Sequence, residues 1–106
     1  MTTALVLTPG HGPDGSPVLR AVGEIDLDNA HELAAAIDRT PESDPPLTID
    51  LSAVEYLDSA GLTVLFARAD RIRLVTSRLL NPLLAVSGLA RIVTVHNVDD
   101  PPDTCG

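Results

Sequence analysis

Five short apolar stretches of the chain, each bounded by polar or turn-forming residues, have the pattern of β-strands. The expected strands cover residues 4–8, 18–26, 47–51, 72–76 and 92–96. Three stretches between them carry apolar residues at the three- and four-residue spacing of an amphipathic helix. The expected helices cover residues 27–37, 59–69 and 79–86. Because strands and helices alternate after the first two strands, the pattern predicts an α/β fold with a mostly parallel sheet.

Glycine and proline mark the turns of this pattern. The Gly/Pro-rich segment 9–17 predicts that the first two strands pair as an antiparallel hairpin at one edge of the sheet. Pro82 fits only the first turn of the last helix, and Gly88 is placed to end that helix in a left-handed conformation. Residues 99–106 are acidic and proline-broken, so we expect a disordered tail after a single domain formed by residues 1–98.

Composition narrows the class of protein. The chain has a net charge of −8 and contains no lysine, so it lacks the basic surface that nucleic-acid phosphates or an anionic membrane would need. It has one phenylalanine and one tyrosine, which means that Leu, Ile, Val and Ala must fill the core. Cys105 is its single cysteine, and no long apolar run or signal pattern is present. We therefore expect a cytoplasmic protein without an internal disulfide.

The candidate chemistry lies at Ser59, which follows Asp58 between an apolar strand and an apolar helix. A helix start presents unpaired N–H groups and the positive end of the helix dipole, so an added phosphate is tolerated there. A simpler interpretation is that Asp58 or Ser59 only caps the helix. The loops 24–28 and 51–59 both follow strand ends, so we expect them to lie close together at the functional edge of the sheet.

A serine nucleophile would need a neighbouring base, and the chain offers only His11, His31 and His96. Leu57 stands two residues before Ser59, so the Gly-x-Ser-x-Gly motif of a hydrolase is absent. The sequence therefore disfavours an enzyme.

Aspartates allow two further alternatives. Asp50 and Asp58 each lie at or after a strand end, as in a phosphoaspartate receiver, but that class also requires a lysine, which this chain lacks. One alternative is that the side chains of Asp26, Asp28 and Asp58 converge to bind a metal ion. The other is that these carboxylates are solvated or cap turns and helices. The latter roles are commoner, so we expect no metal.

Three segments resemble the STAS domain of the bacterial anti-sigma factor antagonist family. They are the Val-Gly-Glu-Ile-Asp sequence at 22–26, the strand, loop and serine at 49–62, and Ser-Gly-Leu at 87–89. The resemblance implies a STAS-type mixed, mostly parallel sheet with an N-terminal hairpin edge strand and three to four helices. The chain departs from the family pattern at Ala60, where Ser or Thr is frequent, and in a short segment after the serine helix.

The resemblance also implies a function in partner switching during a stress response. The unphosphorylated antagonist would bind an anti-sigma factor and free a sigma factor, and the anti-sigma factor would use ATP and magnesium to phosphorylate Ser59. A serine phosphatase would reset the cycle. The chain itself would need no cofactor and would be a monomer when free. The partner-binding residues implied are Gly23, Glu24, Asp26, Asp28, Asp58, Ser59, Ala60 and Gly61. Within the same family, a non-phosphorylated scaffold, a nucleotide-binding module and a transporter-associated subunit remain alternatives.

Overall fold

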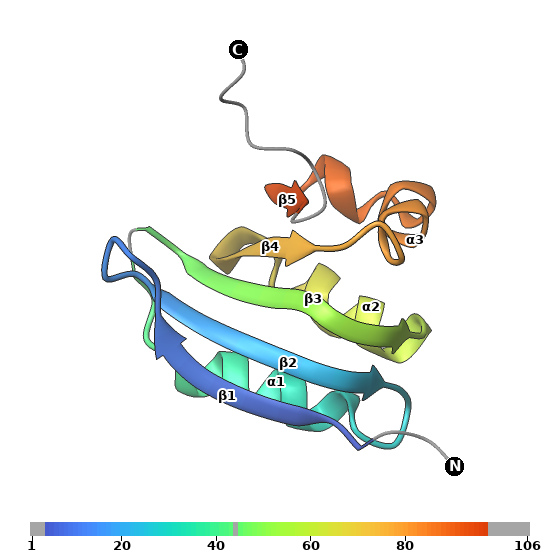
Figure 1. Ribbon diagram of the computed structural model, residues 1–106, viewed down its shortest axis with the longest axis horizontal. Helices are drawn as coiled ribbons and strands as arrows, with labels where there is room; N and C mark the ends of the chain where they lie inside the picture. Colours follow the sequence, from blue (N-terminus) through green and yellow to red (C-terminus); the bar gives the residue numbers. More distant parts are fainter. Residues whose placement is uncertain (1–3, 44, 98–106) are drawn as a thin grey trace.

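The computed structural model describes residues 4–43 and 45–97, so the expected tail and Cys105 lie outside the described residues. The described residues form one five-stranded sheet in the order β1-β2-β3-β4-β5 (Figure 1). The strands are β1 (Val6–His11), β2 (Pro17–Ile25), β3 (Leu47–Leu57), β4 (Ile72–Thr76) and β5 (Val95–Asn97). β1 is antiparallel to β2 at the edge, and all other neighbours are parallel. The predicted hairpin and α/β class are therefore confirmed.

The helices connect neighbouring parallel strands, and each connection steps across the sheet in the same direction. They are α1 (Ala30–Arg39), α2 (Ser59–Ala67) and α3 (Asn81–Ser87), with short 3₁₀ turns η1 (Ala69–Arg71) and η2 (Leu89–Arg91). Right-handed crossovers that all step one way place their helices on one face of the sheet. Figure 1 shows α1 and α2 behind the strands, and no described helix covers the front face.

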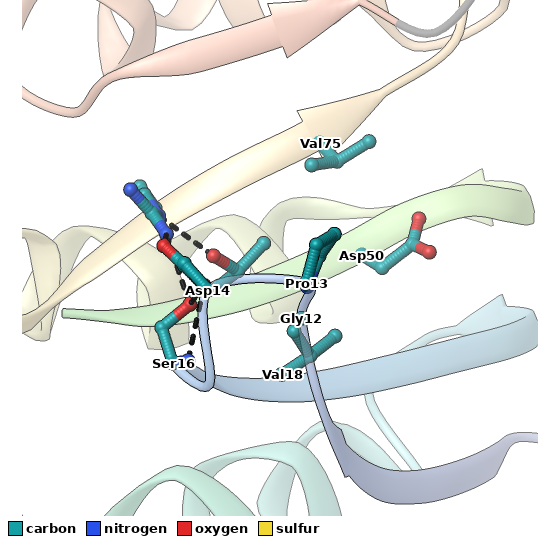
Figure 2. A pocket seen from close by; sticks show the side chains of 9 residues that line it. Gly12, Pro13, Asp14, Ser16, Val18, Asp50 and Val75 are labelled. Carbon is teal, nitrogen blue, oxygen red and sulfur yellow. Dashed lines mark hydrogen bonds and ion pairs between the residues drawn. The ribbon is translucent and has the colours of Figure 1, made fainter. Parts of the chain in front are cut away.

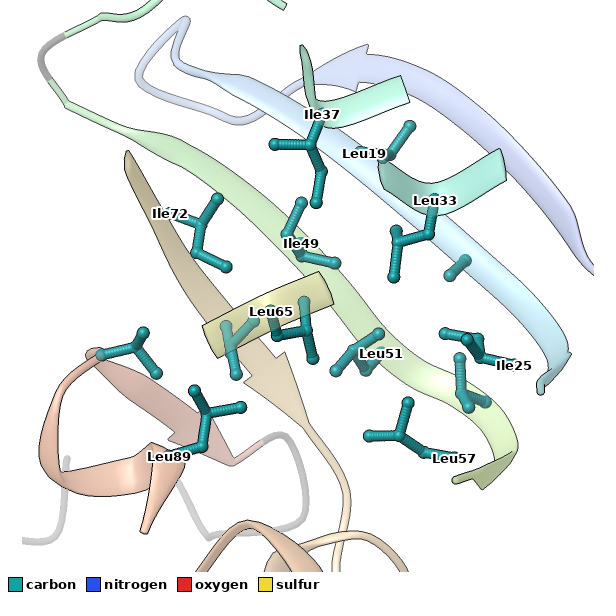
Figure 3. Packing of buried hydrophobic residues seen from close by; sticks show 14 of the residues in the cluster. Leu19, Ile25, Leu33, Ile37, Ile49, Leu51, Leu57, Leu65, Ile72 and Leu89 are labelled. Carbon is teal, nitrogen blue, oxygen red and sulfur yellow. The ribbon is translucent and has the colours of Figure 1, made fainter. Parts of the chain in front are cut away.

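The hydrophobic core lies between the sheet and these helices (Figure 3). The largest fully buried side chains are Ile25, Leu33, Ile37, Ile49, Leu51, Val54, Leu65, Leu74, Thr76, Leu84 and Leu89. Aliphatic residues thus fill the interior, as the composition predicts. Both aromatic residues, Tyr56 and Phe66, are exposed instead, at 49% and 38%.

β3 is longer than the sequence predicts. We expected a strand over 47–51 followed by a loop, but the strand continues to Leu57. Its register with β2 shifts twice, between Arg20/Val22 and between Gly23/Glu24 of β2. At each shift β3 uses one residue more than β2, which is a β-bulge. Buried residues therefore recur at 51, 54 and 57 in place of alternate positions, and the strand period is hidden in the sequence.

Other predicted boundaries also differ. β4 matches the expected strand and Pro82 lies in the first turn of α3, which ends at Gly88 with φ 88° as predicted. The first strand lies two to three residues later than expected, and β5 begins only at Val95. α1 begins at Ala30 and α3 at Asn81, so the expected helical positions at Leu27 and Leu79 lie in loops.

Candidate functional site

Ser59 is the first residue of α2 and its side chain is exposed. The helix is capped by Asp58, whose Oδ1 accepts hydrogen bonds from the backbone N–H groups of Ala60 at 2.8 Å and Gly61 at 3.3 Å. Among the described residues, no hydrogen bond occupies the Ser59 hydroxyl. Of the two capping residues that the sequence allowed, Asp58 takes the role, and this leaves the serine available at the surface.

Asp58 also joins α2 to the loop after β2. Its Oδ2 accepts a hydrogen bond from the backbone N–H of Leu27 at 3.1 Å. Its own N–H donates to the carbonyl of Ile25 at 3.1 Å. The two loops that the sequence predicted to converge therefore meet at this residue. We use the name carboxyl edge for the end of the sheet at which β2, β3 and β4 finish, and the name amino edge for the end at which they begin. Neither is the lateral edge formed by β1.

The loop between β2 and α1 is closed by side chains on its own backbone. Oδ1 of Asp26 accepts from the N–H groups of Asp28 at 2.9 Å and Asn29 at 3.2 Å. The Asn29 amide donates to the carbonyl of Glu24 and accepts from the N–H of Asp26, both at 2.9 Å. Sequence reasoning missed Asn29, although an Asp and an Asn three residues apart are typical of such side-chain-closed turns.

Two of the predicted partner-binding residues are buried glycines that shape the site from below. Gly61 packs so closely on Leu57 and Ile25 that a Cβ atom would lie 2.8 Å from Cγ2 of Ile25 and overlap the Leu57 side chain. Gly23 lies at the second register shift with φ 108°, a conformation that favours glycine. Ala60 is half-buried. The helix start can therefore approach β2 and β3 more closely than a larger residue would permit.

The site is acidic. Asp28 is exposed, Glu24 and Asp26 are half-buried, and the half-buried Asp58 directly precedes Ser59. Asp26 and Asp58 direct their carboxylates at backbone N–H groups. Within residues 4–43 and 45–97, no group of three His, Cys, Asp or Glu side chains is placed to hold a metal ion.

In the described part of the chain, the residues of the enzyme alternatives make the following contacts. None of the three histidines forms a hydrogen bond with Ser59, and His11 lies at the amino edge, paired with Pro17. Asp50, the receiver candidate, accepts hydrogen bonds from the Ser52 hydroxyl at 2.6 Å and from its N–H at 3.0 Å.

A separate cavity of about 430 Å³ opens under the β1–β2 loop, on the face of the sheet that the helices leave free (Figure 2). At one end Arg73 donates to Thr48 at 2.7 Å and to Ser16 at 3.2 Å, and it pairs with Asp14 at 3.7 Å. Asp50 lines the cavity as well. One arginine against two carboxylates makes the cavity acidic, which disfavours the phosphates of a nucleotide.

An ion pair at the amino edge joins the two helices behind the sheet. Arg68, at the end of α2, donates two hydrogen bonds of 2.9 Å to the Asp38 carboxylate of α1. These hydrogen bonds lower the pKa of Asp38 below its ordinary value, and the positive charges of Arg68 and Arg71 act in the same direction. The same contact raises the pKa of Arg68. Arg71 also donates to the carbonyls of Ile37 and Thr40 at the end of α1.

Comparison with known proteins shows the family to which this fold belongs. A family model described as "Mlab, STAS domain" matches residues 11–100. The chain belongs to the STAS domain family. This STAS domain is 28% identical to an anti-sigma factor antagonist from Mycobacterium paratuberculosis, with a TM-score of 0.74 over 88% of this chain and 86% of that chain. A solved structure from Thermotoga maritima shares the fold at 18% identity, with a TM-score of 0.61 over 93% and 90% of the two chains.

Curated relatives match a shorter part of the STAS domain. Over 60 residues it is 47% identical to the anti-sigma-F factor antagonist RsfB of Mycobacterium tuberculosis, in two strains. The match covers 56% of this chain and 49% of RsfB, so the chain spans about half the length of the curated relatives it matches. No helix among the described residues is long and apolar enough to cross a membrane.

Proposed function

We propose that this STAS domain is an anti-sigma factor antagonist whose binding is switched by phosphorylation of Ser59. The observation that carries the proposal is the exposed serine at a helix start that Asp58 already caps, so its hydroxyl is not needed by the fold. The similarity to anti-sigma factor antagonists in sequence and structure supports the same class of partner.

In the proposed cycle, the unmodified domain binds an anti-sigma factor through the carboxyl edge and so frees a sigma factor. The anti-sigma factor is a serine kinase that carries ATP and magnesium. The Ser59 oxygen attacks the γ-phosphorus of ATP, ADP leaves, and the hydroxyl proton passes to a base of the kinase. A phosphatase removes the phosphate by hydrolysis. The STAS domain supplies the acceptor and the docking surface and performs no catalysis itself.

Charge and bulk explain how the phosphate would end binding. A phosphoserine adds about 1.5–2 negative charges. It would do so next to the Asp58 carboxylate on an already acidic surface. A partner surface that complements the unmodified edge would then meet both repulsion and the cost of desolvating the phosphate.

The proposal is tested with wild-type, Ser59→Ala and Ser59→Asp proteins as baits in lysate of the host. We expect wild type and Ser59→Ala to retain a kinase-like anti-sigma factor and Ser59→Asp to lose it. The purified partner, supplied with labelled ATP and magnesium, should label wild type but not Ser59→Ala. Thr63→Ala is the matched control, because Thr63 is exposed one turn further along the same face of α2. It should be labelled normally.

Two results would contradict this function. Equal retention of one partner by wild type and Ser59→Asp would indicate a scaffold without a serine switch. Retention of transporter subunits in place of an anti-sigma factor would place the chain with the transport-associated members of the family.

A further inference from the structure

Two leucines stand out at the carboxyl edge because their side chains are 78% exposed at Leu27 and 63% exposed at Leu79. Leu27 follows β2, and Leu79 follows β4. β3 lies between these two parallel strands and ends next to Ser59. The loops that follow β2 and β4 therefore lie on either side of the strand that leads to the serine (Figure 1).

The loop that carries Leu27 is fixed in place. Asp58 binds the Leu27 N–H at 3.1 Å, and the Asp26 and Asn29 side chains close the turn around it. A side chain presented by such a loop loses little conformational freedom when a partner covers it.

The loop that carries Leu79 is fixed in a similar way. The carbonyl of Ser77 accepts from the N–H groups of Leu80 and Asn81, both at 3.2 Å. The buried Thr76 hydroxyl donates to the Asn81 side chain at 2.6 Å. Leu80 is only 3% exposed and anchors the turn in the core. Its neighbour Leu79 is thereby directed to the surface, so its exposure follows from the loop geometry.

The sequence predicts Leu27 among the apolar positions of one helix and Leu79 as the first residue of another, but both residues lie in loops and neither is buried. Single exposed leucines are ordinary on protein surfaces. Two of them on ordered loops that flank one exposed serine form a pattern that the core does not require. Places where a local sequence rule fails in this way are frequently functional.

Charge indicates what kind of surface would cover them. The Leu27 loop carries Asp26 and Asp28, and Glu24 lies next to it near the end of β2. Five of the arginines belong to the opposite, amino edge, where helices end or strands begin: Arg39, Arg68, Arg71, Arg73 and Arg91. A complementary partner therefore presents basic side chains to the Leu27 loop and apolar hollows to the leucines.

We propose that Leu27 and Leu79 are the apolar anchors by which this domain binds its anti-sigma factor, one on each side of Ser59. The proposal rests on the function proposed above and adds the residues that provide affinity. It also explains the switch, because a phosphate on Ser59 would lie between two contacts that must exclude water. Closing both contacts would then bury a charged group without a matched partner.

The test measures the dissociation constants of purified Leu27→Ser and Leu79→Ser for the anti-sigma factor that wild type captures. Ile92→Ser is the matched control, since Ile92 is 53% exposed but precedes β5 at the amino edge. We expect each edge variant to bind at least about tenfold more weakly, as for anchor residues of protein interfaces. The control should stay within about twofold of wild type. Thermal unfolding of all three should match wild type, which separates a lost contact from a lost fold.

The outcomes distinguish the two proposals. If wild type binds the anti-sigma factor and both leucine variants bind equally well, the anchor proposal is wrong and the proposed function stands. If wild type captures no anti-sigma factor, the proposed function is wrong, and the anchor proposal that rests on it is wrong as well. Light scattering over a range of concentrations covers the remaining occupant, a second copy of this chain. A dimer that only the leucine variants lose, with anti-sigma binding unchanged, would overturn the anchor assignment.

Discussion

At the scale of single residues, Asp58 is the structural centre of the site, because its two carboxylate oxygens serve different elements. One caps α2 and the other holds the Leu27 amide. We expect Asp58→Ala to lower the free energy of unfolding by about 1–2 kcal/mol, as for the loss of a helix cap. Asp58→Asn should lose less, because its carbonyl oxygen can still accept from the helix. Urea unfolding measures both.

Asp28→Asn is the control for Asp58. Asp28 is exposed at the same edge, and its carboxylate makes no hydrogen bond among the described residues. Its substitution should change the free energy of unfolding by less than about 0.5 kcal/mol. Equal losses for Asp28→Asn and Asp58→Ala would show that the edge is stabilised by its charge in general and not by the bonds of Asp58.

Gly61 provides a second residue-level prediction. An added methyl group would overlap Leu57 and press on Ile25, so Gly61→Ala should destabilise the domain by about 1–3 kcal/mol despite the better helix propensity of alanine. Gly10→Ala is the matched control, because nothing lies within 4 Å of a Cβ at that position. Thermal unfolding compares the two variants. A stabilised Gly61→Ala would show that α2 can move away from β2 and β3 without cost.

At the scale of elements, the Asp38–Arg68 ion pair connects α1 with α2. Because the pKa of Asp38 is lowered in the folded state, its contribution to stability is fully present above the pKa of the unfolded chain, about 4. It is lost as the pH falls through the lower pKa of the folded state. We expect wild type to unfold at a higher temperature than Asp38→Asn at pH 7, and the difference to shrink below about pH 4.

Glu42→Gln controls for the general effect of removing a carboxylate. Glu42 is exposed, and it forms no ion pair among the described residues. Its unfolding temperature should follow that of wild type over the whole pH range. A difference between wild type and Asp38→Asn that persists unchanged to pH 2 would assign the stabilisation to packing and not to the charge of Asp38.

The elements that the sequence predicted best are those whose periodicity is undisturbed. β4 is regular and buried on alternate residues, and its predicted bounds are correct. The predicted third strand ended too early, at Leu51, because two bulges change the spacing of buried residues in β3 from two to three after that position. The start of α1 was misplaced because Leu27 has helical spacing, while the Asp26 and Asn29 side chains hold the chain in a turn there.

The candidate site was predictable to the extent that local motifs define it. The serine and its neighbouring aspartate follow from the local sequence at the start of a helix. The convergence of the two loops follows from the order of strands and helices. The sequence could not predict that Asp58 caps the helix and leaves the Ser59 hydroxyl exposed, because either residue can cap a helix. The exposure of Leu27 and Leu79 was also missed. It depends on a hydrogen bond from the Leu27 backbone to the distant Asp58 side chain and on one between the Thr76 and Asn81 side chains.

At the scale of the whole molecule, the fold is expected to be insensitive to the switch. The serine side chain makes no hydrogen bond within the described residues, and a charge at a helix N-terminus contributes only about 0.3–1 kcal/mol. Ser59→Asp should therefore change the free energy of unfolding by no more than about 1 kcal/mol. Its amide NMR spectrum should differ from wild type mainly near the carboxyl edge. Changes throughout the core would instead indicate a switch that works by rearranging the domain.

Because of its two bulges, β3 should tolerate insertions and deletions less well than the connection that precedes it. Between Arg20 and Ile25 β2 advances five positions, while its partner β3 advances seven, from Asp50 to Leu57. Deleting one residue within 52–56 would turn every following side chain of the strand to the wrong face and carry the serine out of place. No strand register fixes the number of residues in the proline-rich connection before β3. Natural variation in length should accordingly gather in that connection and spare the last seven residues of β3.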